Sequence, residues 1–155
     1  MPNFSFNISE LLKKPEGESF EVGLNQKIDL ESEVKAKTPF AGSATFIRID
    51  EGIEVQVSGK ITLIVPCGRC GKDFETAMKI SFSKTFWENP KLAAEPTEII
   101  SPKGEIELFP YIRAEILVQI PIKPLCSKLC QSIQPKIESP LKKPSPFDIL
   151  KGRIK

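Results

Sequence analysis

The chain has 155 residues, 40% of them hydrophobic and 27% charged, with a formal net charge of +2. This composition is typical of a soluble globular protein, and the length suffices for one domain with a hydrophobic core. No apolar run approaches the ~18 residues that span a bilayer, so no transmembrane helix is predicted. Residues 1–6 show no basic segment followed by an apolar one, so we expect no secretory signal and a cytoplasmic location.

The charge is divided unevenly along the chain. Residues 123–155 carry eight Lys or Arg and two acidic residues, a sum of +6, whereas the remainder has 14 basic and 18 acidic residues, a sum of −4. A basic segment on an acidic body is typical of a contact with nucleic acid or an acidic protein, and equally of a solvated tail. We therefore predict one β-rich domain over residues 1–130 and a basic, Pro- and Ser-rich C-terminal tail over residues 131–155.

The N-terminal part is expected to dock against this domain. A short helix is predicted around Leu11, with Asn7 or Ser9 as its cap. A weakly alternating stretch at 20–24 is expected to add a strand.

Residues 44–66 carry the clearest β-strand signal. Apolar and polar side chains alternate there with a period of two, which predicts one buried and one exposed face. The apolar side chains of the second half fall on odd positions: Ile53, Val55, Val57, Ile61, Leu63 and Val65. Gly59 has the same parity, which predicts a bulge or bend at that point, and residues 50–52 predict a tight turn.

The alternation resumes after a short segment that contains two cysteines. The two arms 53–66 and 74–87 therefore predict a β-hairpin. Residues 88–104 are polar and contain prolines, which predicts a surface loop. In 105–120 the apolar period changes to that of an amphipathic helix. The predicted fold is α+β and β-rich: an antiparallel, partly closed sheet covered by one amphipathic helix.

The four cysteines form two closely spaced pairs: Cys67, Cys70, Cys126 and Cys130. In a reducing compartment, paired cysteines are more often metal ligands or redox centres than disulfides. A C-x-x-C and a C-x-x-x-C, with no histidine in the chain, predict a four-cysteine metal knuckle, and zinc is the expected ion. The 55 residues between the pairs exceed the gap of a short zinc ribbon, and a rubredoxin-like iron site or a dithiol redox centre stays open.

The absence of histidine also bears on catalysis. It excludes Ser-His, Cys-His and histidine-ligated zinc chemistry, and the chain has no G-x-x-x-x-G-K-[ST] phosphate loop. We therefore expect a binding protein and not an enzyme, without a small-molecule substrate.

The order of these parts resembles that of a known family. Four motifs carry the resemblance, in this order: C-G-R-C at 67–70, G-E-I-E-L at 104–108, I-P-I-K-P at 120–124 and S-P-F-D-I-L at 145–150. Together they are similar to the motifs of the YceD-like family, the large ribosomal RNA subunit accumulation proteins. Many relatives place a further C-P-x-C-G stretch after the second cysteine pair, where this chain has Gln131 and Ser132.

The resemblance implies a non-enzymatic factor in large ribosomal subunit biogenesis. Such a factor assists ribosomal RNA accumulation or processing by binding RNA, a pre-ribosomal particle or a ribosomal protein. From the charge pattern we expect the contact on cations beside the cysteines and in the tail: Arg69, Lys72, Lys128, Lys142, Lys143, Lys151 and Arg153. The alternative is a structural protein–protein interaction module with a zinc staple.

Overall fold

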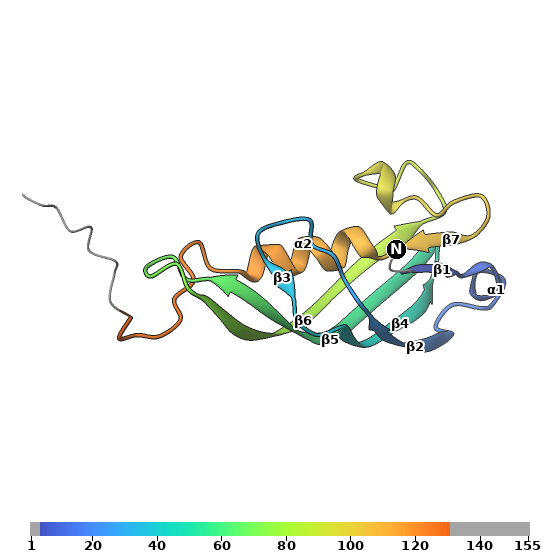
Figure 1. The fold of residues 1–155 in the computed structure, drawn as a ribbon. Coiled ribbons are helices and arrows are strands. Elements are labelled where there is room, and N and C mark those ends of the chain that lie inside the picture. The colour runs from blue at the N-terminus through green and yellow to red at the C-terminus, as the bar shows by residue number, and fades with distance from the viewer. Residues whose placement is uncertain (1–3, 131–155) are drawn as a thin grey trace, which may run out of the picture.

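The computed structural model describes residues 4–130 of the chain (Figure 1). The larger of two antiparallel sheets contains β2 (Ser19–Gln26), β3 (Lys35–Ala36), β4 (Phe40–Ile49), β5 (Gly52–Pro66) and β6 (Asp73–Trp87). The smaller sheet pairs β1 (Ser5–Asn7) with β7 (Glu105–Glu107). The helical elements are α1 (Ser9–Leu12), the 3-10 turn η1 (Pro96–Glu98) and α2 (Phe109–Gln119).

The β5–β6 hairpin is the longest continuous pairing in the described residues. Its register runs from Gly52 opposite Trp87 to Pro66 opposite Asp73 without interruption. The predicted parity is confirmed, because the six odd-numbered apolar side chains of β5 are each 2% exposed or less. One face of the hairpin therefore forms the floor of the core, and the other is polar.

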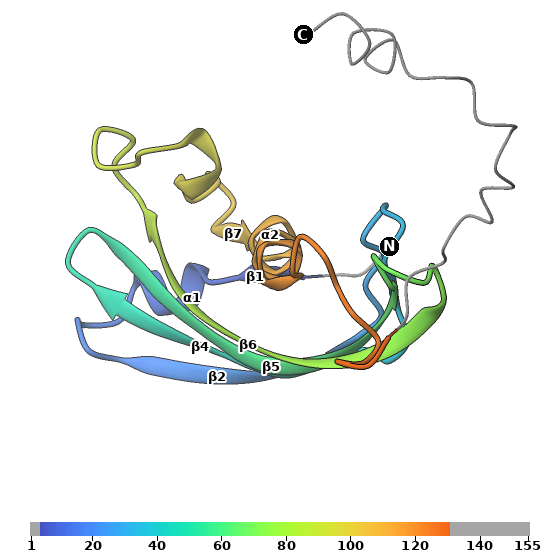
Figure 2. The same ribbon diagram turned by 90° about the vertical axis from the view of Figure 1, so that its left-hand side faces the viewer.

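The five strands curve around α2 (Figure 2). The helix lies on the concave side and buries Ile112 and Ile116 there. The sheet is open, so the predicted partial closure is wrong: β2, β3 and β6 form its outer strands in the described part of the chain. The predicted class, a β-rich α+β fold with an antiparallel sheet covered by a helix, is confirmed. No helix in residues 4–130 has the length and apolar content to cross a membrane.

The predicted helix over 105–120 is wrong at its start. Gly104 adopts φ +70°, which turns the chain, and residues 105–107 then pair with β1 as β7. Ile106 points into the core between two exposed glutamates, so this short stretch follows the strand period. The helix begins only at Phe109, with Pro110 in its first turn, where the missing N–H of proline has no cost.

The bulge predicted at Gly59 is absent. Gly59 pairs with Ile80 on one side and Gly42 on the other, in unbroken register. Both glycines face the core, and a Cβ on Gly59 would lie 2.5 Å from Cζ of Phe40. Gly59 therefore makes room for the Phe40 ring, which is fully buried, and Gly42 allows the close approach of the Ser58–Gly59 backbone.

We predict that Gly42→Ala destabilises the protein by about 1–3 kcal/mol, because its Cβ would overlap the Ser58 carbonyl oxygen and the Gly59 backbone. Gly23→Ala on the adjacent strand β2 is the matched control, since no atom lies within 4 Å of its new Cβ. Urea unfolding of the two variants provides the comparison. Equal free energies of unfolding would contradict the packing role of Gly42.

Lys84 breaks the inward apolar pattern of β6. Its ammonium group lies 2.6 Å from Oε1 of Glu98 and 5.1 Å from the centre of the Tyr111 ring. The other oxygen of Glu98 accepts hydrogen bonds from the backbone N–H groups of Ala94 and Glu95. This ion pair fastens the 88–104 loop to the sheet and to α2.

The pKa of Glu98 is lowered, first by the hydrogen bond from Lys84 and next by that from the Ala94 N–H. A lowered folded-state pKa stabilises the protein above the ordinary carboxyl pKa of 4.5, and this stabilisation is lost as the pH falls through the folded value. We predict that Glu98→Gln lowers the melting temperature at pH 7. The difference from wild type should shrink at pH 3, as measured by thermal unfolding at both values. A difference that is constant with pH would show that the charge of Glu98 contributes nothing.

Candidate metal centre

The first cysteine pair lies in the tight loop that joins β5 to β6. Pro66 ends β5, and the N–H of Cys67 donates to the carbonyl of Lys72 at 2.9 Å. Gly71, at φ +74°, donates to the carbonyl of Cys67 at 2.9 Å. A glycine allows this reversal at no steric cost. We call residues 67–72 the cysteine knuckle.

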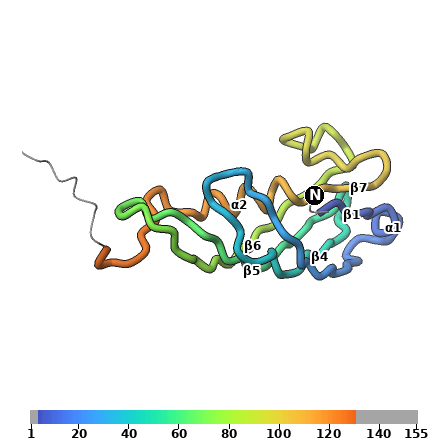
Figure 3. Tube along the Cα trace, in the orientation of Figure 1, coloured from blue at the N-terminus to red at the C-terminus, as the bar shows by residue number. Residues whose placement is uncertain are grey.

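The second pair lies in residues 120–130, here called the cysteine arm, which leaves α2 and returns to the hairpin tip (Figure 3). Two backbone contacts join the arm to the knuckle. The N–H of Gly68 donates to the carbonyl of Pro124 at 2.7 Å, and the N–H of Cys126 donates to Sγ of Cys67 at 3.4 Å. The arm is therefore fixed by backbone groups, whose positions no sequence pattern reveals.

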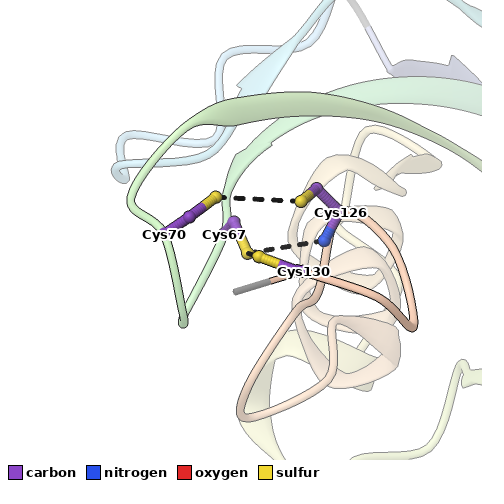
Figure 4. Close-up of side chains that lie close together, drawn as sticks. All are labelled: Cys67, Cys70, Cys126 and Cys130. Carbon is purple, nitrogen blue, oxygen red and sulfur yellow. Dashed lines mark hydrogen bonds between the residues drawn. The ribbon is translucent and has the colours of Figure 1, made fainter. Parts of the chain in front are cut away.

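The four sulfurs converge, as predicted (Figure 4). Cys67 and Cys130 have their sulfurs 3.7 Å apart, as do Cys70 and Cys126, and all four lie within 4.8 Å of one another. A tetrahedral site with metal–sulfur bonds of about 2.3 Å has sulfurs roughly 3.8 Å apart. All four cysteines are free thiols. The arrangement can hold one metal ion.

The backbone around Cys67 favours its thiolate form. N–H groups of Cys70, Cys126 and Arg69 point at its sulfur and lower the pKa of the thiol to about 5. Burial raises the pKa of the Cys130 thiol to about 12, and hydrogen bonds with Cys70 and Cys126 act in the same direction. The fold therefore favours the thiolate form of Cys67. The Cys130 thiol, in contrast, would have to lose its proton when a cation binds.

The predicted binding residues fall into three groups. Arg69 donates through Nη1 to the carbonyl of Cys130 at 3.0 Å, so it braces the arm. Lys72 and Lys128 are exposed and lie within two residues of a cysteine in the sequence. The tail residues Lys142, Lys143, Lys151 and Arg153 lie outside the described residues.

An open antiparallel sheet whose longest hairpin ends in a four-cysteine cluster defines a small protein with a thiol-lined candidate metal site. The family model described as "Large ribosomal RNA subunit accumulation protein YceD" matches residues 53–152. This chain belongs to that family. The matched region begins in β5 and includes all four cysteines. No curated protein and no solved structure matched the chain.

We predict that Cys70→Ser lowers the melting temperature by roughly 5 °C or more, because a metal held by four thiolates contributes to folding free energy. The wild-type melting curve should shift to lower temperature with a strong chelator, and that of the variant should not respond. Ser127→Ala, an exposed change between the ligands of the second pair, is the control. A metal-free wild type that melts identically with and without chelator would rule out a stabilising ion.

Proposed function

We propose that this protein is a non-enzymatic factor of large ribosomal subunit biogenesis that works in the cytoplasm. The family match carries the proposal, because it covers residues 53–152 and its description names large-subunit ribosomal RNA. The factor would assist RNA accumulation or processing by binding ribosomal RNA or a pre-ribosomal particle.

Within this proposal, zinc occupies the cysteine cluster. Four sulfur ligands and no nitrogen or oxygen ligand suit zinc in a structural role, and iron is the other ion that accepts this set. Comparison of native and denatured masses distinguishes zinc from iron and from an empty site. The ion would hold the hairpin tip and the cysteine arm together, adding to the hydrogen bonds that Gly68, Arg69 and Cys126 form between them.

Charge around the cluster supports a role in binding phosphate. A zinc ion with four thiolates has a net charge of −2, and Arg69, Lys72, Lys123 and Lys128, close to the cysteines in the sequence, carry four positive charges. The excess would face outward, and the tail after residue 130 adds six more cations against two acids. Contacts of this kind bind the phosphate backbone with strong salt dependence.

A purely protein-binding role remains the second candidate, since Ile122 and Leu129 of the cysteine arm are 100% and 91% exposed. Apolar side chains beside cations would suit an acidic ribosomal protein. Filter binding to large-subunit ribosomal RNA over a salt series separates the two candidates: direct RNA contact gives an affinity that falls steeply with salt, and a protein contact gives no retention.

We predict that removal of residues 141–155 weakens co-sedimentation with large-subunit precursors and flattens its salt dependence, because this segment carries five of the basic residues. Lys142→Glu with Lys143→Glu should show the same direction of change. Thermal unfolding of both variants controls for loss of folding. If both co-sediment like wild type at every salt concentration, the tail does not contribute and the contact lies on the folded domain.

A further inference from the structure

The convex face of the five-stranded sheet carries two lysines directly opposite each other. Lys60 of β5 and Lys79 of β6 are register partners, and both are exposed. Neither forms an ion pair or a hydrogen bond in the described part of the chain. Two like charges in this position repel each other and reduce sheet stability.

A third lysine extends this pair toward the cysteine knuckle. Lys35 of β3 lies opposite Ile64, whose even position places both side chains on the convex face. Lys35 is exposed and has no ion-pair partner among residues 4–130. The nearby acid Glu75 is neutralised by its ion pair with Lys37. We call Lys35, Lys60 and Lys79 the convex lysine stripe.

Within residues 4–130, the surroundings of the pair contain no acid that could offset its charge. Along the two strands and across them, the nearest side chains on the same face are short and neutral: Ala41, Ser43, Ser58, Thr62, Ala77 and Ser81. Hydroxyl groups can donate to phosphate oxygens, and short side chains let a ligand backbone approach the sheet closely. The surface around the lysine pair is therefore cationic, smooth and rich in hydroxyl groups.

We infer that the convex lysine stripe binds the sugar–phosphate backbone of RNA, as a surface separate from the cysteine knuckle and the tail; this inference rests on the proposed function. Partner lysines have Cβ atoms about 5 Å apart, so both ammonium groups can reach one phosphate or two adjacent ones. Seven residues of strand separate Lys60 from Cys67, or about 23 Å at 3.3 Å per residue. An RNA strand along the hairpin would thus contact the stripe and then Arg69 and Lys72.

The composition of this face favours RNA over an acidic protein. In the described residues, the exposed large hydrophobic side chains are Leu92, Val118, Ile122, Leu125 and Leu129, none of which lies on the sheet. Protein interfaces depend on buried apolar and aromatic anchors, which the stripe lacks. No aromatic side chain of the described strands neighbours the lysine pair, so the proposed contact is with phosphate and not with base edges.

The test compares full-length wild type with Lys60→Gln/Lys79→Gln in filter binding to a large-subunit ribosomal RNA transcript and to poly(U), over about 50 to 200 mM salt. We expect the slope of log affinity against log salt to fall by about 1.5 for both RNAs, since each lost phosphate contact removes 0.7 to 0.9. The melting temperature should stay equal or rise, because a repulsion is removed. A lysine pair that only packs its stems against the sheet would instead give a lower melting temperature and an unchanged slope.

Lys91→Gln/Lys103→Gln is the matched control: it removes the same charge from the 88–104 loop, which lies on the opposite side of the sheet (Figure 2). If the wild type binds RNA and all three proteins give equal salt slopes, the inference about the convex lysine stripe is wrong, and the proposed RNA contact is not affected. If the wild type retains neither RNA, both the proposed RNA contact and the inference about the stripe are wrong. Tight binding to polyglutamate, lost in the Lys60/Lys79 variant, would assign the stripe to an acidic protein instead.

Discussion

The uninterrupted pairing of β5 with β6 is the constraint on which the rest of the structure depends. Fifteen register pairs hold the two strands from Gly52 to Pro66. A slip by one residue would turn the buried Val, Leu and Ile side chains of β5 to solvent. The same register brings Cys67 and Cys70 to the hairpin tip, places Lys60 opposite Lys79 and points Lys84 at the core. Core, metal site and charged face are consequences of one alignment.

Two features of this alignment work against stability. Lys84 points to the concave side and is satisfied only because Glu98 arrives from the 88–104 loop and Tyr111 from α2. Lys60 and Lys79 repel each other on the convex side, and no acid of the described residues lies beside them. Lys84 protects the edge of the sheet, since an inward charge on an outer strand discourages pairing with another chain. The Lys60–Lys79 pair has no structural benefit. We therefore explain these facing charges by the binding of a ligand.

The cysteine arm joins this hairpin to the helix by few contacts. Its link to the knuckle consists of hydrogen bonds from Gly68, Arg69 and Cys126 and of the sulfur cluster itself. An ion shared by two cysteines from each side would fix the exit of α2 relative to the sheet. It would also set where the basic tail leaves the domain. The candidate metal site therefore lies where the described part of the chain ends, at Cys130.

The sequence by itself determined the local periods and the ligand pairs. The alternation in β5 and β6 predicted the hairpin, and the cysteine spacings predicted a four-sulfur site, because both depend on neighbours within a few residues. Tertiary structure decided what depends on distant partners. Residues 105–107 became a strand because β1 lay beside them, and Gly59 made room for Phe40 instead of forming a bulge. The register of Lys60 against Lys79, and the backbone bonds that aim the cysteine arm, exist only once segments far apart in the chain have met.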